Sequence, residues 1–278
     1  MKKLCLVFLL MLYGCERDAQ APAHTLTHAH VPAPAHEAFI PEIKTIKFIF
    51  QDDKVTEKPE QAELPKNAYT HIPELARVIK ELEYPIYLPQ FVAGLIEQES
   101  CITLRHSRCW SPTAELKTSR EYGFGLGQIT VAYNTDGSER FNIFKELKAQ
   151  KGFEDWDWND RFNPKYQIRG IIVKLRSTDS FLKFEKADEY EAIAFLLSAY
   201  NGGAGHVLKD RQICLRKEGC DPSRWFGHVE LDSVKSKTPQ PAYGNQSFFQ
   251  INRKYAPRVL GERMHKYTWY MESFLTEE

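Results

Sequence analysis

The sequence lacks an excess of charge of either sign, because 37 lysines and arginines balance 37 aspartates and glutamates in 278 residues. Nucleic-acid-binding proteins usually carry a basic footprint, so this balance suits a neutral polymer better as a partner. No close C-x-x-C pair occurs, which weakens the case for a zinc site. No internal repeat and no alternation of strands with helices is visible. We therefore predict a mainly helical fold.

An apolar run of the length that a membrane-spanning helix needs is lacking even at the N-terminus. The run from Leu4 to Leu12 follows two lysines and is too short to span a bilayer, but it is typical of a secretory signal. The following L-Y-G-C resembles a bacterial lipobox, which makes Cys15 the expected lipidated residue; an ordinary cleaved signal peptide is the alternative. Because Glu16 follows, we expect lipid anchoring on the periplasmic side of the outer membrane, with the inner membrane as the alternative.

Cysteine is scarce, and its number fits an exported protein. Of the six cysteines, Cys5 would leave with the signal peptide and one would carry the lipid. An even remainder in an oxidising compartment predicts disulfides. Of three possible connectivities, the local pairs Cys101–Cys109 and Cys214–Cys220 would close short loops, each contributing roughly 2–3 kcal/mol. A zinc site made of these four cysteines is the alternative; we expect no metal.

Residues 16–68 are rich in alanine, proline and histidine and show no sustained periodicity. Such a composition buries too little apolar surface to offset chain entropy. We therefore predict a disordered tether between a signal peptide, residues 1–15, and a single folded domain, residues 69–278. The run from Ile43 to Phe50 could form an isolated strand or dock on the domain. The histidines of the tether could bind a metal, but a solvated linker is the expectation.

Helix signals recur through the domain. Pro73 stands where a helix would begin, and Asn163 with Pro164 is typical of an N-cap and first helical position. Residues 192–200 are almost all apolar, which predicts a buried central helix that ends at glycines. A last long helix is expected over residues 256–274. These segments are the basis for a mainly α domain.

The stretch L-P-Q-F-V-A-G-L-I-E-Q-E-S places a carboxylate at the end of an apolar helix face. Its apolar residues between Leu88 and Ile96 fall at helical spacing, with Pro89 at the start, and Glu99 is the next position on that face. Glu97 is expected to point elsewhere and stay in water. A carboxyl on an apolar face favours its protonated form and can act as a general acid. A structural glutamate paired with a nearby arginine is the alternative.

Two further motifs could share a site with this carboxyl. The segment E-Y-G-F-G-L-G-Q has three alternate glycines, whose bare backbone lets a flat ligand approach closely. No G-K-[ST] follows, which argues against a phosphate loop. Gln128 offers a donor and acceptors, which suits the hydroxyl and N-acetyl groups of a carbohydrate. Tyr200, in A-Y-N-G-G, lies on a buried helix face, where either a carboxyl or a backbone carbonyl could bind its hydroxyl.

Taken in order, these motifs resemble the lysozyme-like lytic transglycosylases with a soluble-lytic-transglycosylase domain. The matching residues are Glu99-Ser100, Gly125-Leu126-Gly127-Gln128 and Ala199-Tyr200-Asn201, with a similar late element at Tyr255 and Val259. The resemblance spans roughly residues 75–275 and implies an α+β lysozyme-like fold that is mainly α. The family usually has methionine at the position of Gly127, so we expect a roomier, more flexible floor in the sugar site.

The resemblance implies cleavage of the bond between N-acetylmuramic acid (MurNAc) and N-acetylglucosamine (GlcNAc) in peptidoglycan, with no cofactor. Glu99 would protonate the glycosidic oxygen and then take the proton of the C6 hydroxyl, which closes a 1,6-anhydro ring. One carboxyl then suffices where many glycosidases use two. Tyr200 would orient Glu99, and Ser100 would bond Glu99 or cap the helix end. The implied substrate-binding residues are Gly125, Leu126, Gly127, Gln128, Asn201 and Tyr255.

Glu121 keeps a second reaction open, because it precedes the glycines and could approach the sugar from the opposite face. If it activated a water, the enzyme would be an inverting muramidase. Otherwise it would pair with Arg120 or Lys117, or support the glycine turn. A third possibility is a non-catalytic peptidoglycan-binding lipoprotein on the same scaffold, which would keep its function in a Glu99→Gln variant.

The segment 134–161 looks like an insertion into a minimal domain. Its tryptophans Trp156 and Trp158 could stack on sugar rings, but packing beneath a loop is the prediction. For the whole protein we expect peptidoglycan glycan strands as a partner and, through the lipid on Cys15, a membrane. Nucleic acid is not an expected partner, and protein partners are left open.

Overall fold

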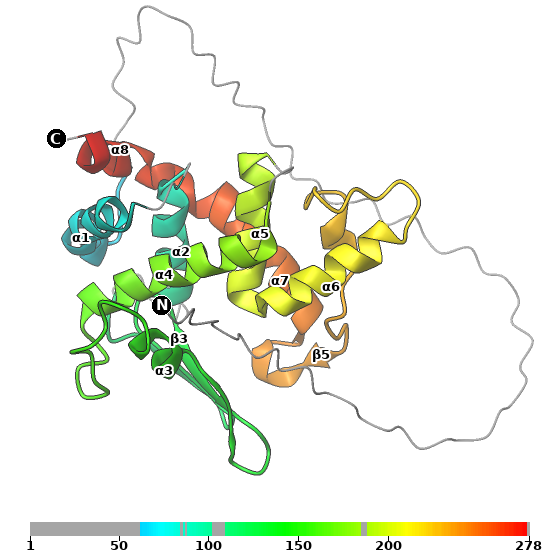
Figure 1. Ribbon diagram of the computed structural model, residues 1–278, viewed down its shortest axis with the longest axis horizontal. Helices are drawn as coiled ribbons and strands as arrows, with labels where there is room; N and C mark the ends of the chain where they lie inside the picture. Colours follow the sequence, from blue (N-terminus) through cyan, green and yellow to red (C-terminus); the bar gives the residue numbers. More distant parts are fainter. Residues whose placement is uncertain (1–61, 84–85, 87, 102–108, 185–187, 277–278) are drawn as a thin grey trace, which may run out of the picture. The chain divides into compact units, whose positions relative to one another are not determined.

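Helices dominate the part of the chain that the structure describes, and one small four-stranded sheet accompanies them (Figure 1). The computed structural model describes residues 62–83, 86, 88–101, 109–184 and 188–276, all within the unit Phe48–Glu278. This content confirms the predicted fold class, mainly α with a smaller β part.

The described elements are of three kinds: α-helices, strands and short 3-10 or π-helical segments. The α-helices are α1 (Lys66–Leu82), α2 (Gln90–Ser100), α3 (Ile143–Lys148), α4 (Pro164–Leu182), α5 (Glu189–Gly202), α6 (Ala204–Leu215), α7 (Phe248–Pro257) and α8 (Thr268–Thr276). The strands are β1 (Glu115–Lys117), β2 (Glu121–Phe124), β3 (Ile129–Tyr133), β4 (Glu139–Asn142), β5 (Pro239–Gln240) and β6 (Gln246–Ser247). The short segments are the 3-10 helices η2 (Val229–Leu231), η3 (Pro241–Tyr243) and η5 (Met264–Tyr267) and the π-helical η4 (Arg258–Arg263).

The predicted signal peptide, Cys15 and residues 16–61 of the predicted tether lie outside the described residues. The boundary between tether and domain also stays a prediction. Helix α1 begins at Lys66, and Pro73 lies inside it instead of at its start, so that helix-start prediction was wrong. The apolar packing of this region extends back to Leu64, which is buried, and this explains the earlier start. None of the described helices is long and apolar enough to cross a membrane.

Helix α5 is the buried central helix that its apolar sequence predicted. Every residue from Ile193 to Tyr200 is buried, and each fully buried leucine or phenylalanine contributes about 1.5–3 kcal/mol. Asp188 caps the helix by accepting from the backbone N–H of Glu191. Helices α4, α6 and α7 contact α5. The helix therefore delivers its C-terminal end, which carries the A-Y-N motif, to a fixed place among these neighbours.

Helix α2 and the two predicted disulfides are present. The helix begins directly after Pro89 and packs against η4 and η5. Gly94 permits this close approach, because a Cβ there would lie 3.1 Å from the backbone nitrogen of Met264. The disulfide Cys101–Cys109 follows the end of α2 with a Cα–Cα distance of 4.3 Å. The second disulfide is Cys214–Cys220, so local pairing is confirmed.

The predicted single helix over residues 256–274 was wrong. The chain instead runs through α7, η4, η5 and α8 in succession. Pro257 lies at the end of α7, where a proline removes a backbone hydrogen bond and clashes with the preceding turn. The π-helical segment η4 follows directly after this proline. The break lets α7 pack on α5 while η4 and η5 pack on α2.

The positions of the strands in the sheet were not predicted, and the sheet builds one wall of the site described below. Its antiparallel order is β1-β2-β3-β4, and Leu116, Gly123 and Thr130 are cross-strand neighbours in one row. A second small core contains Phe124 of β2 and Trp156 of the segment 134–161. Its buried residues are Phe124, Ile129, Phe144, Leu147, Phe153 and Trp156. The packing prediction is therefore confirmed for Trp156, which is fully buried.

Candidate active site

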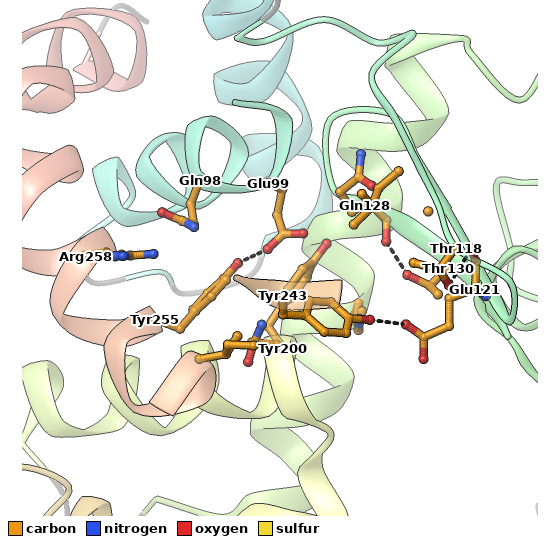
Figure 2. A pocket seen from close by; sticks show the side chains of 15 residues that line it. Gln98, Glu99, Thr118, Glu121, Gln128, Thr130, Tyr200, Tyr243, Tyr255 and Arg258 are labelled. Carbon is orange, nitrogen blue, oxygen red and sulfur yellow. Dashed lines mark hydrogen bonds between the residues drawn. The ribbon is translucent and has the colours of Figure 1, made fainter. Parts of the chain in front are cut away.

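Side chains from α2, the sheet, α4, α5 and α7 surround a cavity of about 290 Å³ (Figure 2). Among the predicted site residues, those that line it are Glu99, Glu121, Gln128, Tyr200, Asn201 and Tyr255. Segments that are far apart in the sequence therefore meet as the motif order suggested. Ser100, Gly125, Leu126 and Gly127 do not line the cavity, and their contacts explain why.

Glu99 lies at the end of α2 and holds a proton more tightly than an ordinary glutamate. Burial raises its pKa to about 7, although a hydrogen bond from Tyr255 and the positive charge of Lys174 both act to lower that pKa. Part of the side chain stays accessible at the cavity wall, so a ligand can reach it. The carboxyl can therefore give up a proton near neutral pH and take one back.

Tyr255, and not Tyr200, is the hydrogen-bond partner of Glu99. The Tyr255 hydroxyl donates to Oε1 of Glu99 (Figure 2), whereas the Tyr200 hydroxyl donates to the carbonyl of Gly127 at 2.7 Å. The predicted orienting role of Tyr200 was therefore wrong, because the end of α5 packs against the turn formed by residues 125–128 (the glycine turn). Tyr255 reaches the carboxyl from α7 and also lines the cavity, so its expected contact with substrate stays a prediction.

Gly127 does not leave a roomy floor, contrary to the prediction. A Cβ at this position would lie 2.5 Å from Cγ1 of Ile171 and 2.6 Å from the hydroxyl of Tyr200. These two side chains already occupy the space that a larger residue would fill. The glycine therefore permits close packing of the turn against α4 and α5, and it does not enlarge the cavity.

The predicted binding residues Gly125 and Leu126 are buried in the turn and serve its conformation. Gly125 adopts a φ of +77°, and the amide of Gln167 occupies the place of its missing Cβ. Oε1 of Gln167 accepts from the backbone N–H of Leu126 at 2.9 Å, while Nε2 donates to two backbone carbonyls. Sequence reasoning missed Gln167, although a glutamine among the apolar residues of α4 was the available signal.

Ser100 does not contact Glu99 through a hydrogen bond. Its hydroxyl donates to the carbonyl of Ile96 at 2.6 Å and accepts from the backbone N–H of Trp110 at 2.7 Å. It therefore joins the end of α2 to the segment that follows the first disulfide. Of the two predicted roles, fixing the helix end is the one that the contacts support.

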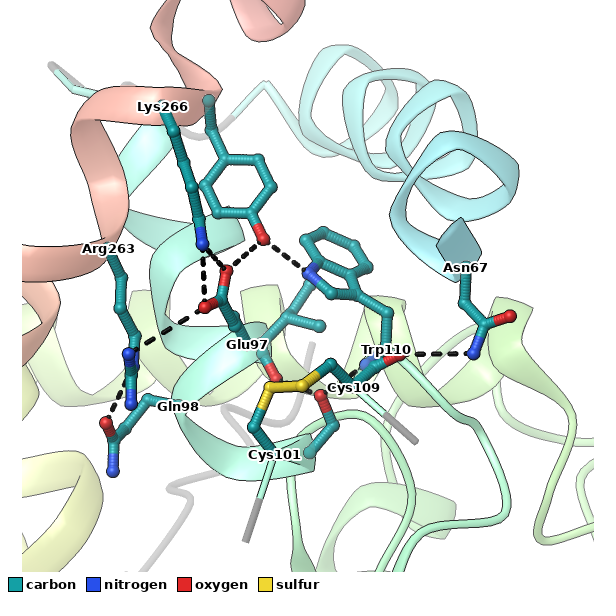
Figure 3. The surroundings of a disulfide bond; sticks show 11 residues. Asn67, Glu97, Gln98, Cys101, Cys109, Trp110, Arg263 and Lys266 are labelled. Carbon is teal, nitrogen blue, oxygen red and sulfur yellow. Dashed lines mark hydrogen bonds and ion pairs between the residues drawn. A yellow bond between two sulfur atoms is a disulfide. The ribbon is translucent and has the colours of Figure 1, made fainter. Parts of the chain in front are cut away.

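Glu97 is buried, so the prediction that it stays in water was wrong. Only 6% of it is exposed, and Nζ of Lys266 lies 2.7 Å and 2.8 Å from its two carboxylate oxygens (Figure 3). The Tyr267 hydroxyl also donates to it and in turn accepts from the indole of Trp110. The segments η4 and η5 bring these partners to α2 from the far end of the chain, and no pattern within α2 could reveal them.

Two side-chain amides face the cavity with fixed orientations. Nε2 of Gln128 donates to the carbonyls of Gly125 and Ala114 at 3.2 Å and 3.4 Å, and its Oε1 has no partner among the described residues. Oδ1 of Asn201 accepts from Nδ2 of Asn252 at 3.0 Å, which leaves its own NH2 group for a ligand. Asn201 therefore offers a donor to the cavity, whereas Oε1 of Gln128 is buried and has no partner among the described residues.

Lys174 also lines the cavity and was not found from the sequence. Its Nζ lies 4.0 Å from the ring centroid of Tyr200, a cation–π geometry. Burial lowers the pKa of Lys174, and the negative charges of Glu99 and Glu146 oppose that lowering. A lysine between the apolar residues 171–173 and Leu175 was the available signal, and it places a positive charge beside the candidate acid.

Comparison with known proteins adds evidence for part of the chain. No family model matches the chain. Over 111 residues the chain is 30% identical to the membrane-bound lytic murein transglycosylase F of Vibrio parahaemolyticus. The matched stretch covers 39% of this chain and 20% of that protein. Over 82 residues it is 33% identical to the protein of the same name from Vibrio cholerae, and this match covers 30% of this chain and 14% of that protein. This stretch is similar to lytic murein transglycosylases. The chain spans about a fifth or less of the length of these relatives.

A second carboxyl, Glu121, stands at the sheet wall of the same cavity. It pairs with Arg140 at 3.0 Å and accepts from the hydroxyl of Tyr243 at 3.5 Å (Figure 2). The predicted partners Arg120 and Lys117 do not hold it in the described part of the chain. No group of three or more histidine, cysteine, aspartate or glutamate side chains that could hold a metal occurs among the described residues.

Proposed function

We propose that this protein is a peptidoglycan lytic transglycosylase, which cleaves the β-1,4 bond between MurNAc and GlcNAc and leaves a 1,6-anhydro-MurNAc end. The observation that carries the proposal is Glu99, a carboxyl with a pKa of about 7 at the wall of a cavity lined by amides. The similarity to lytic murein transglycosylases supports it independently. One group that can first give and then accept a proton is what this reaction requires.

In the first step, protonated Glu99 gives its proton to the glycosidic oxygen as the bond from that oxygen to C1 of MurNAc breaks. Tyr255 donates to Oε1, so the proton resides on Oε2, and the same hydrogen bond stabilises the carboxylate that forms. The GlcNAc end leaves with a new hydroxyl group. The positive charge at C1 is stabilised by the N-acetyl oxygen of the same sugar.

In the second step, the O6 hydroxyl of MurNAc attacks C1 and loses its proton to the Glu99 carboxylate. The 1,6-anhydro ring closes, Glu99 is protonated again, and no water is consumed. The positive charge of Lys174 stabilises the carboxylate between the two steps. Asn201 would donate to a carbonyl or hydroxyl oxygen of the glycan, and Gln128 would contact the sugar from the sheet side of the cavity.

An inverting muramidase is the second candidate, because Glu121 lines the same cavity. Its carboxylate is ion-paired and its side chain is 38% exposed, which leaves it in reach of solvent and able to act as a base. Such an enzyme would use both carboxyls. A binding lipoprotein is the third candidate, and it would need neither of them.

Release of dye-labelled fragments from purified peptidoglycan separates these three functions. For the transglycosylase, Glu99→Gln loses roughly 10²- to 10⁴-fold in rate, the usual contribution of a general acid. Glu121→Gln stays within about threefold of wild type, because Glu121 transfers no proton in this reaction. A large loss in both variants would favour the muramidase. If the wild type binds peptidoglycan but releases no fragments, the result would favour the non-catalytic binding protein.

We further infer that the chain is exported, lipidated on Cys15 and anchored on the periplasmic side of the outer membrane, with its folded domain starting near residue 69. Two disulfides support an oxidising compartment, and the relatives are named membrane-bound. Metabolic labelling with a palmitate analogue tests the anchor. Label in the wild type that is absent from Cys15→Ser is expected, and equal label in both would contradict lipidation there.

A further inference from the structure

Gln98, which lies between Glu97 and Glu99 on α2, lines the cavity and has no role in the account so far. Nε of Arg263 donates to its Oε1 at 2.8 Å. A guanidinium has donors only, so the amide oxygen must face Arg263 and the NH2 group must face away from it. Figure 2 shows that NH2 group on the side of Tyr255 and Glu99.

Arg263 is itself held in place, so the orientation of the amide is set before a ligand arrives. Nη1 of Arg263 lies 3.7 Å from Oε1 of Glu97, and the buried Glu97 is fixed by Lys266 and Tyr267 (Figure 3). A buried carboxylate with several partners does not turn freely. The network therefore extends from η5 through Glu97 and Arg263 to the edge of the cavity.

The edge of the cavity at Gln98 has the opposite polarity to the sheet wall at Glu121. Arg258, which carries only donors, lies on the same side of Glu99 as Gln98 (Figure 2), whereas the sheet side has the carboxylate of Glu121. A ligand that spans the cavity must therefore present an acceptor oxygen toward α2 and donors toward the sheet.

We propose that Gln98 is a further substrate-binding residue, which donates through Nε2 to an acceptor oxygen of the sugar beside Glu99, and that Arg263 is the positioning residue that holds this amide. The inference rests on the proposed function, because it takes the glycan as the ligand. It assigns to the buried Glu97 network a task in substrate binding in addition to its packing of the C-terminal segments on α2.

Binding of a peptide-free GlcNAc-MurNAc tetrasaccharide, measured by titration calorimetry, tests this assignment. The full chain with Glu99→Gln serves as background, since it prevents turnover and removes any coupling to the charge of Glu99. Gln98→Glu keeps an acceptor for Arg263, loses the donor and adds a negative charge, whereas Gln98→Met loses both the acceptor and the donor without adding charge. We expect each to weaken binding about five- to tenfold, the usual loss for one hydrogen bond. Gln212→Glu, an exposed position on α6, is the matched control and should bind as the background does.

Arg263→Met frees the amide without removing it, so it should weaken binding about two- to threefold. In the active enzyme it should raise KM with kcat unchanged, a split that a loss of folding would not give. Binding of Gln98→Glu equal to that of the control would overturn the role of Gln98. If Gln98→Glu does weaken binding but Arg263→Met matches the control, the positioning role of Arg263 is overturned.

The outcomes also separate this inference from the proposed function. Wild type that cleaves peptidoglycan, with KM unaltered in Gln98→Glu, would overturn the inference alone. Wild type that binds the tetrasaccharide but does not cleave, with weaker binding in Gln98→Glu, would overturn the proposed reaction and keep the inference. Absence of both cleavage and binding in the wild type would overturn both.

Discussion

At the scale of single residues, burial and charge act on Glu99 in opposite directions. Burial raises its pKa to about 7, and the charge of Lys174 is one of two effects that oppose the rise. A general acid must be protonated before it acts, so kcat/KM should fall as the pH rises through this pKa. Lys174→Met removes the opposing charge and raises the pKa further. We therefore expect the alkaline limb of the kcat/KM profile to move to higher pH.

The control for this shift is Lys165→Met, an exposed lysine on the same helix, which should leave the profile in place. An alkaline limb that is the same in Lys174→Met and wild type would show that Lys174 does not act on the group that titrates. A limb that moves to lower pH would contradict the sign of the effect.

The same pKa predicts how the stability of the fold depends on pH. The carboxyl has an ordinary pKa of 4.5 and a folded-state value of about 7, so the folded state binds the proton more tightly. Stability from this group is therefore lost as the pH rises from 4.5 through 7. Glu99→Gln cannot titrate. We expect the free energy of unfolding of this variant, measured in urea relative to that of wild type, to increase by about 2 kcal/mol between pH 5 and pH 8.

A stability difference that is constant between these two pH values would show that Glu99 titrates alike in the folded and unfolded chain. That result would remove the physical basis for its action as an acid near neutral pH.

The residue scale also shows what the sequence could predict. Glu99 was found because an apolar helix face ends on it, and that pattern is local. The identity of its partner depends on where α5 and α7 lie, so Tyr200 was chosen in place of Tyr255. Glu97 was misplaced for the same reason, since its partners come from η4 and η5.

At the scale of elements, the glycine turn and the end of α5 fit against each other at one point. An added Cβ at Gly127 would lie 2.6 Å from the hydroxyl of Tyr200 and 2.5 Å from Ile171. We expect Gly127→Ala to lower the free energy of unfolding by about 1–3 kcal/mol through overpacking. Urea titration checks this, with Gly205→Ala on α6 as control, because no atom lies within 4 Å of a Cβ there.

Tyr200→Phe adds a second test of this contact. It removes the hydrogen bond to the Gly127 carbonyl, and in combination with Gly127→Ala the two losses should be less than additive, because both act on one contact. Full additivity, or a Gly127→Ala variant as stable as the Gly205→Ala control, would contradict the packing account.

Elements that a cap or an apolar run marks in the sequence were predictable, and elements without such a mark were not. Asn163 and Pro164 start α4 as expected, and the apolar run of α5 is buried as expected. The strands β1 to β4 were missed because each has only three to five residues and the glycines of β2 suggested a loop. The helix predicted over residues 256–274 is instead the end of α7 followed by η4, η5 and α8, and the sequence signal of the break is Pro257, which ends α7.

At the scale of the whole molecule, the described part has two cores. The larger one lies among the helices, and the smaller one, built around Trp156, supports the sheet that forms the wall of the cavity. Trp156→Ala should cost about 3–5 kcal/mol locally, as for other buried tryptophans. In hydrogen exchange we expect faster exchange of the amides of β3, with those of α5 little changed.

Trp269 is the matched control, since 41% of it is exposed and it lies on α8, away from the small core. Its replacement by alanine should leave the exchange of β3 close to that of wild type. If Trp156→Ala accelerates exchange in α5 as much as in β3, the two cores are one cooperative unit and this description of the molecule is wrong.

The central claim is that one carboxyl performs both proton transfers and that no water enters the products. The most direct test is digestion of purified peptidoglycan by the full chain in oxygen-18 water, with mass spectrometry of the released muropeptides. The account predicts 1,6-anhydro-MurNAc ends that carry no oxygen-18 and that are absent with Glu99→Gln. Reducing ends that carry oxygen-18 would contradict it and would identify a hydrolase, with Glu121 as the base.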